Sequence, residues 1–516
     1  MGTIDVGKDT GAVIARGSGA GRGRRAAARL IPIVIALVAT YALLIVVAMV
    51  TTSFNGRQLD FSVYYAAEAA LRANPHANIY DPSVLASAAR ALPGCKLWPG
   101  AAYPYPPLLA ILMLPLGALP FDTALHVWML FSLALWAVDT ALLVYWLRTL
   151  LSEGTADAAS NGLSWRRRMA NVMRGQADGP AMAAVGVVAV SVLAWPLLQG
   201  LLMGQVHVLL LFLLLCVPLC VRRNRPGLAG ALLALAIMIK VLPLLLLAYY
   251  LARGRWRLVL SAAAVSLLLL GATWLVVGAP TLLHAQAIFG SGYHFANSPD
   301  NLALAQAPIW LAAAFGSHAA LLVDGLGRGL IALIAMLFAG GLVVVWRMAR
   351  AAGAPRRLQS DTGAETTELL GYGWAICAML LLSPLVWLHY YSLLLLPFVV
   401  CVGYVLRARR RMRMPKRGDH YTTLVLLLVA GALLFLPWSP GIDTSAHAAG
   451  PHLAGIALNP LLMLVQPASV ALLWCVAGWL LWRSRRGEAE PAMRSAHPAS
   501  QQASNETVSQ RVWYSE

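Results

Sequence analysis

The sequence has few charged residues and is rich in apolar ones. Charged side chains make up 12% of its 516 residues and hydrophobic side chains 59%, whereas about a quarter of the residues in a soluble domain are charged. This composition excludes an ordinary soluble domain and predicts a polytopic membrane protein. The length allows about a dozen membrane spans and one ordered loop region.

Acidic residues and patterned cysteines are also scarce. The chain has 21 Asp and Glu against 39 Lys and Arg, a net charge of +18. Most basic residues flank apolar runs, which is the positive-inside pattern. They therefore indicate topology and contacts with anionic membrane lipids, and we expect no nucleic-acid partner. The six cysteines are scattered, so neither a disulfide framework nor a metal-ligand spacing is visible.

The Asp-x-Asp triplet that holds a metal and a nucleotide sugar is absent from the whole sequence. We therefore expect no nucleotide-sugar site of that kind. The expectation for the site is also no metal ligand and no cofactor, although the missing triplet does not by itself exclude a metal.

Hydrophobic runs divide the chain into one membrane domain and two polar ends. We expect disordered cytoplasmic tails at 1–29 and 484–516, and an all-α, polytopic membrane helix bundle of about 11–13 transmembrane helices at 30–483. A run at 106–120 is shorter than the roughly 20 residues that a spanning helix needs, so it is either re-entrant or a tilted short span. The spans are expected at 30–52, 121–147, 179–203, 205–221, 226–239, 241–252, 257–279, 326–349, 366–382, 388–405, 421–438 and 456–483.

Blocks of basic residues assign the ends of these spans to the two faces of the membrane. Residues 222–225 and 253–257 are both basic, so both should face the cytoplasm, as should the two termini. The segment between them should enter the membrane and return as two short helices, with a turn at Lys240 that Pro243 favours. On the opposite face we expect 53–105, 204–207, 280–325, 383–389 and 441–455.

The first of these loops, residues 53–105, is long, polar and rich in aromatic residues. Residues 60–92 are predicted to form two short helices lying along the membrane surface. Asp60 has two interpretations, a reactive carboxylate or a helix N-cap. Asp81 is a better cap, because Pro82 follows it at the preferred first helical position.

Polar groups among the apolar spans are further candidates for a site. Lys240 is costly to bury unless an anion such as a lipid phosphate pairs with it, and the alternative is that it extends to the interface. His389 could bind a phosphate oxygen or a sugar hydroxyl, or be an ordinary hydrogen-bonded side chain. Trp387 and Tyr390 could stack on a sugar or belong to an aromatic belt. The polar loop at 284–301 is a candidate lid or acceptor contact.

Several short motifs follow one another in a characteristic order. They are the run from Asp60 to Tyr65, Tyr105-Pro106-Pro107-Leu108, the run from Pro115 to Pro120, Gly204-Gln205-Val206-His207, the Lys240 segment closed by Arg255-Trp256-Arg257, and Ser383-Pro384 with Trp387 and His389. Over residues 30–405 this set resembles the integral-membrane glycosyltransferases of family 87, which are polyprenyl-phosphate-mannose-dependent alpha-mannosyltransferases. One departure is His207, since the family usually has Asn at that position.

The resemblance implies a helix bundle of GT-C type and an inverting hexosyltransferase. Its donor would be a polyprenyl-phosphate sugar, with mannose as the first choice, and its acceptor a glycan or glycolipid outside the cytoplasm. The motif makes Asp60 the general base, and His389 resembles the family's active-site histidine. The implied location is the bacterial cell (inner) membrane. We expect donor contacts from Lys240, Gln205, His207, Trp387, Tyr64 and Tyr105.

The chemistry agrees with these roles. A polyprenyl phosphate is a good leaving group, so the transfer needs mainly one base on the acceptor hydroxyl, unlike the paired carboxyl groups of glycosidases. The departing anion needs cationic or hydrogen-bonding partners.

Three other functions fit parts of the sequence. A transporter or lipid-linked sugar flippase would share the many spans and the buried lysine. It would not require a long ordered loop after the first span, and the inverted halves that would support it are not visible. A non-catalytic membrane scaffold is the second alternative. The third is an enzyme that takes a different hexose or a pentose from the same lipid carrier.

Overall fold

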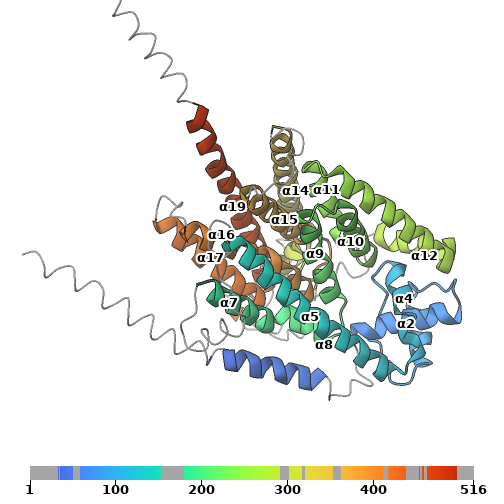
Figure 1. Cartoon of the computed structure of the whole chain (residues 1–516). Coiled ribbons are helices and arrows are strands. Elements are labelled where there is room, and N and C mark those ends of the chain that lie inside the picture. Colours follow the sequence, from blue (N-terminus) through green and yellow to red (C-terminus); the bar gives the residue numbers. More distant parts are fainter. Residues whose placement is uncertain are drawn as a thin grey trace, which may run out of the picture.

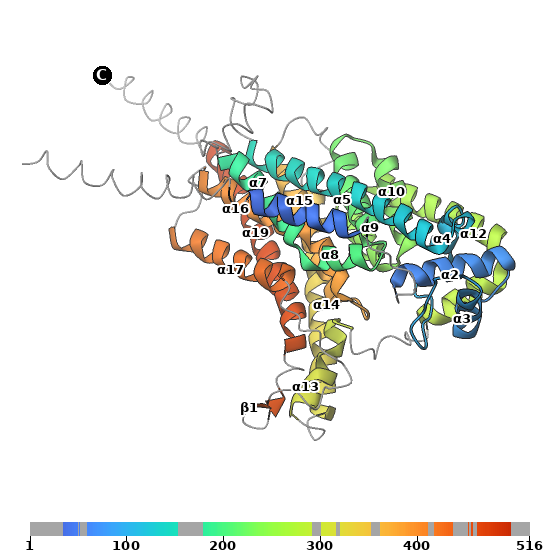
Figure 2. The ribbon, with the colours of Figure 1, turned by 90° about the horizontal axis from the view of Figure 1, so that it is seen from below.

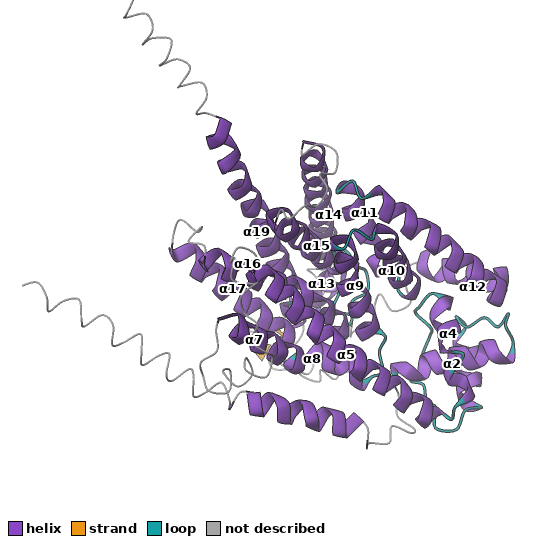
Figure 3. Ribbon diagram, viewed as in Figure 1, coloured by secondary structure: helices purple, strands orange, loops and turns teal. Residues whose placement is uncertain are grey.

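The computed structural model describes residues 33, 35–49, 51, 59–152, 179–290, 301–315, 320–351, 362–410, 417–436, 452–453, 456–457 and 462–496. Figure 1 and Figure 3 show that helices make up nearly all of this part of the chain. Its sheet structure is one antiparallel pair of two-residue strands, β1 (His452–Leu453) and β2 (Ile456–Ala457). The predicted all-α architecture is confirmed.

The helices keep the order that the hydrophobic runs predict, after a first helix over Ile35–Met49. In the described ranges, short 3-10 turns connect or begin some of them: η1 (Leu116–Ala118), η3 (Leu242–Leu244), η4 (Leu304–Gln306) and η6 (Leu388–Leu394). The α-helices are α2 (Asp60–Ala73), α3 (Pro82–Arg90), α4 (Pro107–Met113), α5 (Phe121–Ser152), α7 (Gly179–Leu193), α8 (Trp195–Leu202), α9 (His207–Arg222), α10 (Pro226–Ile239), α11 (Leu245–Ala252), α12 (Trp256–Gly290), α13 (Ala307–Phe315), α14 (Ala320–Ala351), α15 (Thr362–Leu381), α16 (Leu395–Arg410), α17 (Arg417–Phe435) and α19 (Val465–Ala496).

The lengths and composition of these helices are those of a multi-pass membrane protein. Within the described residues, five helices are long and apolar enough to cross a bilayer, and α7 and α8 together form a further candidate span bent by 45°. Five shorter apolar helices of 10–17 residues accompany them. The expected total of about 11–13 spans is therefore reached only if the shorter helices cross as well.

Burial distinguishes the helices at the centre of the bundle from those at its edge. Of the most apolar window in the segment Leu388–Arg409, 78% is buried inside the protein, whereas the corresponding value for Trp256–Gln286 is 11%. On α12, Leu268 and Leu275 are 72% and 78% exposed. Side chains this apolar and this exposed suit contact with lipid, so α16 is central and α12 lies at the periphery.

The segment at 106–120 neither spans nor tilts across the bundle. It consists of α4, the turn η1 and their connections. A helix of seven residues is only about 10 Å long, against a hydrocarbon core of about 30 Å. Prolines at both ends limit α4, since Pro107 starts it and Pro115 follows it.

Among the described helices, α12 and α19 extend furthest beyond the predicted spans. α12 bends at Gly278, which has a φ of 75°, and continues to Gly290, so 284–290 is helical rather than part of a polar loop. α19 begins at Val465 rather than at 456, and its helix reaches Ala496, inside the region expected to be a disordered tail. The residues after Trp482 are rich in Ala, Glu and Arg, which favour helix without a hydrophobic period. Residues 1–29 and 497–516 lie outside the described part.

The short helices of the first loop gather at one end of the bundle. Figure 1 and Figure 2 show α2 and α4 beside the far end of α12, and α2 also packs against α3. Two contacts fasten α12 to the turn that follows α2. His76 Nδ1 lies 3.2 Å from the carbonyl oxygen of Val277, and the Thr281 hydroxyl donates to the carbonyl of Ala77 at 3.4 Å. We call the described residues 59–120 the loop end of the bundle.

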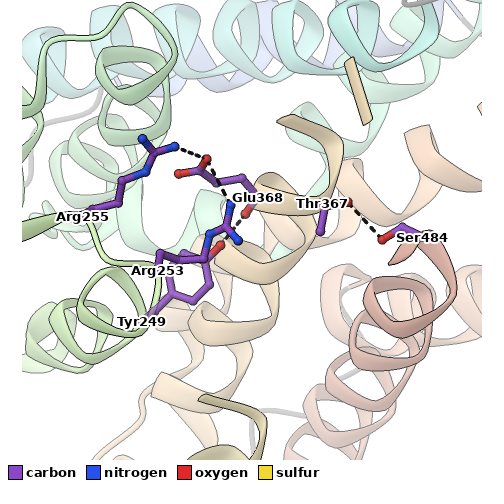
Figure 4. Close-up of polar contacts among 6 residues, drawn as sticks. All are labelled: Tyr249, Arg253, Arg255, Thr367, Glu368 and Ser484. Atoms are coloured by element: carbon purple, nitrogen blue, oxygen red, sulfur yellow. Dashed lines mark hydrogen bonds and ion pairs between the residues drawn. The ribbon is translucent and has the colours of Figure 1, made fainter. Parts of the chain in front are cut away.

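The opposite end, formed by residues 222–225 and 253–257 and the helix ends beside them, carries a cluster of ion pairs. We call it the basic end. Oε2 of Glu368 on α15 lies 2.6 Å from Nη2 of Arg255 and 3.7 Å from Nη2 of Arg253, forming two ion pairs (Figure 4). In the same view, the hydroxyls of Thr367 and Ser484 are 3.2 Å apart and join α15 to α19. These contacts connect the α11–α12 turn with the centre of the bundle.

Candidate active site

Asp60 is the first residue of α2, and its carboxylate does not cap that helix. The N-cap position belongs to Leu59, with no side-chain hydrogen bond to the helix. Oδ2 of Asp60 instead accepts a hydrogen bond from Nε2 of Gln205. Asp81 is a true N-cap of α3, since its Oδ1 accepts the backbone N–H of Ser83 at 2.8 Å. The capping interpretation therefore holds for Asp81 and not for Asp60.

Gln205 comes from the tight turn between α8 and α9. The turn requires a glycine at 204, whose φ is +67°. A Cβ there would also lie 2.8 Å from Cβ of Phe61. The carbonyl of Gly204 accepts the indole N–H of Trp128 at 2.7 Å, and the backbone N–H of Phe61 donates to Met203 at 3.2 Å. The turn is thus fastened both to α5 and to the first turn of α2.

Two tyrosine hydroxyls complete the surroundings of the Gln205 amide. Its Oε1 accepts hydrogen bonds from Tyr64 at 2.7 Å and from Tyr105 at 3.0 Å. The two rings meet edge to face, with centroids 5.1 Å apart, a favourable arrangement for aromatic pairs. Tyr64 lies one helical turn after Asp60, and Tyr105 precedes α4, so the amide joins both parts of the loop end.

The environment of Asp60 makes its carboxyl group a suitable proton acceptor near neutral pH. Burial raises the pKa of Asp60 to about 6, because desolvation outweighs the hydrogen bond from Gln205 and the positive charge of Lys240, which both lower it. A general base is most effective when its pKa lies near the working pH. At pH 7 this carboxyl group is mostly ionised while retaining more basicity than an exposed Asp.

Lys240 occupies the break between α10 and η3, as the proline-induced turn predicts. It is 7% exposed, so it does not extend to the interface. Its Nζ lies 3.2 Å from Nε2 of His207 and 3.5 Å from the centroid of the Tyr390 ring. The Tyr105 ring is 4.9 Å away on another side. Aromatic faces stabilise a desolvated ammonium group, so the rings of Tyr390 and Tyr105 suit a positive charge at this place.

His389 adds a second imidazole to this cluster. Its ring centroid lies 4.3 Å from that of His207, and the centroid of Trp387 is 5.9 Å away. His389 is 4% exposed and His207 1%. Nε2 of His389 and Nδ1 of His207 have no hydrogen-bond partner among the described residues. Buried polar atoms without partners are rare in folded proteins, so these two nitrogens are candidates for ligand contacts.

A narrow pocket opens beside Asp60. The space in it that admits the centre of a water molecule is about 10 Å³, which is room for roughly one water. A sugar can therefore enter only when the side chains around it move. The lining residues are Asp60, Val63, Tyr64, Trp98, Ala102, Pro104, Tyr105 and Trp387.

The structure brings every predicted site residue into one continuous cluster. Lys240 connects its two halves, because its ammonium group contacts both the Tyr105 ring and His207. Within the described part of the chain, no group of three or more His, Cys, Asp or Glu side chains is arranged to hold a metal ion. The cluster contains Asp60, Tyr64, Tyr105, Gln205, His207, Lys240, Trp387 and His389.

Two further residues contribute to the site. Tyr390, a candidate for stacking on a sugar, contacts both Lys240 and His207. Trp98 lines the pocket and was not predicted as a site residue. A tryptophan in a polar loop looks like an ordinary interfacial residue, so no pattern in the sequence distinguishes Trp98.

Asn301, at the end of the polar loop predicted at 284–301, forms hydrogen bonds to the backbone of two segments. Its Oδ1 accepts the backbone N–H groups of Ala303 at 3.1 Å and Val386 at 2.9 Å, and its Nδ2 donates to Pro384 at 2.9 Å. It thereby holds the segment that leads into His389. The loop residues at 291–300, which include three of the expected polar contacts, lie outside the described part of the chain.

Comparisons with known proteins agree with the resemblance. The model of glycosyltransferase family 87 matches residues 103–384, more than half of the chain. Within this range lie Tyr105, Gln205, His207 and Lys240, whereas Asp60 and His389 lie outside it.

One similar protein is the polyprenol-phosphate-mannose-dependent alpha-(1-2)-phosphatidylinositol pentamannoside mannosyltransferase of Mycolicibacterium smegmatis, with 29% identity over 231 residues. That alignment covers 42% of this chain and 47% of the relative. The chain therefore spans about half the length of the curated relative that it matches.

Proposed function

The chain belongs to glycosyltransferase family 87, and on that premise we propose that it transfers a sugar from a polyprenyl-phosphate donor to an acceptor hydroxyl outside the cytoplasm. Mannose is the first candidate for the sugar, because the mycobacterial relative is named for its dependence on polyprenol-phosphate-mannose. The observation that carries the proposal is that a carboxylate, Asp60, and a basic side chain, Lys240, meet in one cluster through Tyr105. Gln205 joins Asp60 to the Tyr105 hydroxyl, and Nζ of Lys240 lies 4.9 Å from the centroid of the Tyr105 ring. A base for the acceptor and a cation for the leaving group are what this reaction needs.

Asp60 acts as the general base. Its carboxylate removes the proton of the acceptor hydroxyl while that oxygen forms a bond to C1 of the sugar. The bond between C1 and the phosphate oxygen breaks, and its electron pair leaves with the polyprenyl phosphate. A single displacement of this kind inverts the configuration at C1. Its pKa of about 6 lets Asp60 be ionised before the reaction and protonated after it.

Lys240 and the two histidines stabilise the leaving phosphate. The donor diester carries one negative charge, and the released monoester develops a second one. The ammonium group of Lys240 supplies the opposite charge in a desolvated place, where it is worth more than in water. His207 and His389 supply N–H groups, because each has a buried ring nitrogen without a hydrogen-bond partner among the described residues.

Two tryptophans are placed to contact the transferred or accepting sugar. Trp98 and Trp387 both line the pocket beside Asp60. Aromatic faces and convergent polar groups are a typical combination in small-molecule sites. Trp387 also lies next to His389, so it extends from the proposed phosphate contacts to the proposed base.

The proposed orientation places the loop end outside the cytoplasm. The Arg residues at 222–225 and 253–257 occupy the basic end, which the positive-inside rule assigns to the cytoplasm together with both termini. The polyprenyl chain lies in the bilayer, and its phosphate enters the site sideways. The membrane in question is the bacterial cell (inner) membrane, and the acceptor is a glycan or glycolipid on its outer side.

The test measures transfer of labelled mannose from polyprenyl-phosphate mannose in reconstituted vesicles supplied with a lipid-linked glycan acceptor. The wild type should transfer mannose, and Asp60→Asn should reduce the rate by about 100-fold or more, the usual contribution of a general base. Asp81→Asn is the matched control, because Asn caps α3 as well as Asp does, and it should keep full activity.

Three results would contradict parts of this proposal. Equal rates for wild type and Asp60→Asn would remove the base role from Asp60. Movement of the labelled donor across the bilayer without transfer would make the protein a flippase. Transfer of a different sugar from the same carrier, with no use of mannose, would replace the donor.

A further inference from the structure

We propose that Gln205 is a positioning residue that fixes the orientation of the Asp60 carboxylate, and that Tyr64 and Tyr105 in turn hold the Gln205 amide in place. The inference rests on the proposed function for the role of Asp60. The sequence predicted that Gln205 contacts the lipid-linked sugar donor. Its amide instead has the role of holding the general base, Asp60.

The polar atoms of the Gln205 side chain are already engaged inside the protein. The residue is 1% exposed. Nε2 donates to Oδ2 of Asp60, and Oε1 accepts from Tyr64 at 2.7 Å and from Tyr105 at 3.0 Å. An amide oxygen has two lone pairs, so both hydroxyl groups satisfy it. Oε1 therefore has no lone pair left for a sugar donor, and of the two hydrogens on Nε2 one is committed to Asp60.

The arrangement permits only one orientation of the amide. If the amide were turned over, Oε1 would face the carboxylate of Asp60, and two acceptors would meet without a proton between them. In the observed orientation, the two hydroxyl groups both donate toward Oε1 and leave Nε2 for the carboxylate. The ionised carboxylate, which can only accept, therefore selects this orientation of the amide, and the two tyrosine hydroxyls complete it by donating to Oε1.

The backbone makes this support rigid. Gln205 N–H donates to the carbonyl of Gly200 at 2.8 Å, and Phe61, which directly follows Asp60, donates from its backbone to Met203 at 3.2 Å. The turn that carries the amide and the helix that carries the carboxylate are thus bonded to each other twice, once through side chains and once through the main chain. Such a double connection holds a catalytic group in place before the substrate binds.

The consequence concerns which oxygen of Asp60 accepts the proton. Oδ2 is occupied by Gln205, whereas Oδ1 has no hydrogen bond within the described residues, and Asp60 lines the pocket. Oδ1 is then the oxygen available to the acceptor hydroxyl. Because the amide hydrogen bond stabilises the ionised form, it also lowers the pKa of Asp60 against the effect of burial.

The test titrates the protonated-carboxyl infrared band of Asp60 in reconstituted protein, with Asp60→Asn identifying the band. The midpoint should lie near pH 6 in the wild type. In Gln205→Met it should move up by about one to two pH units, the equivalent of a hydrogen bond to a charged group. Gln466→Met is the matched control, because Gln466 is a buried amide in α19, away from the elements that form the site, and should leave the midpoint unchanged.

A second variant keeps Gln205 and removes the two hydroxyl groups that donate to its Oε1. The double change Tyr64→Phe and Tyr105→Phe should shift the midpoint in the same direction by a smaller amount, and it provides the test if Gln205→Met does not fold. The same vesicles are assayed for mannose transfer. Gln205→Met should lose kcat mainly at low pH and recover as the pH rises, with little change in the KM for the donor.

The outcomes separate this inference from the proposed function. An unchanged midpoint in Gln205→Met and in the tyrosine variant would overturn the positioning role, whether or not mannose is transferred. A higher KM for the donor with an unchanged midpoint would assign Gln205 to the donor instead. If the titration midpoint shifts in Gln205→Met while the wild type itself transfers no sugar, the positioning role is upheld and the proposed reaction is rejected.

Discussion

Lys240 and His207 face each other at the centre of the site, with Nζ 3.2 Å from Nε2. An ammonium group has hydrogens to donate and no lone pair, so Nε2 of His207 must be the acceptor. The proton of the neutral imidazole then belongs on Nδ1. That nitrogen is buried and has no partner among the described residues. The lysine thus prepares the histidine to donate its other N–H to a ligand.

Removing the ammonium group should weaken the hold on the donor phosphate. We expect Lys240→Met to raise the KM for the polyprenyl-phosphate donor by about 10- to 100-fold, the loss typical of a charge-assisted contact. The measurement is the dependence of the initial rate on donor concentration in vesicles. Lys96→Met is the control, since Lys96 is exposed in the loop and its loss should leave the KM unaltered. An unchanged donor KM in Lys240→Met would reject the phosphate role.

The rate of transfer should depend on pH through Asp60. Because a base must be ionised to accept a proton, kcat/KM should fall as the pH drops below about 6, the raised pKa of Asp60. A profile of kcat/KM from pH 5 to 8.5 checks this expectation. An acid limb near pH 4, the ordinary range of an exposed carboxyl group, would show that a solvated acid performs the step.

The same pKa makes a prediction about stability. A folded-state pKa of about 6, raised from 3.8, means that the native protein binds the proton of Asp60 more tightly than the unfolded chain does. Stability is therefore lost as the pH rises through this window, by up to about 3 kcal/mol. Asp60→Asn should consequently unfold at a higher temperature than the wild type at pH 8, with the difference shrinking toward pH 4. If Asp60→Asn unfolded at the same temperature as the wild type at pH 8, or at a lower one, the raised pKa of Asp60 would be contradicted.

Gly204 offers a test of the turn that carries Gln205. Both Gly204 and Gly100 have a positive φ, but only at Gly204 would a Cβ meet another atom closely, 2.8 Å from Phe61, while at Gly100 nothing lies within 4 Å. Gly100→Ala should cost about 1–2 kcal/mol from backbone strain alone and leave transfer intact. Gly204→Ala should cost more and reduce transfer strongly, because it pushes α2 away from the turn. If Gly204→Ala and Gly100→Ala had equal effects on thermal unfolding and on transfer, the close packing of Gly204 against Phe61 would be unimportant.

The ion pairs of the basic end should matter for stability and leave the chemistry unaffected. We expect Glu368→Gln to lower the free energy of unfolding by about 1–3 kcal/mol, because Arg253 and Arg255 lose their shared partner. The two arginines are 18% and 26% exposed, so solvent reduces the penalty. Asp122→Asn breaks an exposed pair with His126 and should cost less than about 1 kcal/mol. A large loss of transfer in folded Glu368→Gln would link the two ends functionally.

Hydrophobic length and basic blocks were sufficient to predict most helices. The span predicted at 226–239 coincides with α10, because Arg225 precedes it and Lys240 with Pro243 ends it. The bounds of α12 and α19 were less predictable. α12 turns at Gly278 and continues through Pro280, since packing against the His76 turn supports the helix beyond its apolar part. Local signals contain no information about such a neighbour.

The site was predictable in its members and not in its contacts. Asp60 and Lys240 attract attention because a charge next to or within apolar sequence is costly. The partner of Asp60, however, is a residue 145 positions away, and which side chains meet over that distance is decided by helix packing. The family motif nominated Gln205 as a donor contact, whereas the structure places its amide against the carboxylate.

The lengths of α9 and α10 determine where His207 and Lys240 lie along the bundle. They leave the same turn at 223–225 and end at His207 and Lys240, after 16 and 14 residues respectively, or about 24 and 21 Å. The two basic side chains meet at one depth because these lengths nearly match. One residue added to α10 would raise Lys240 by about 1.5 Å and rotate it by about 100°, away from His207. The depth of the proposed phosphate site is thus set by the number of residues between it and the basic end.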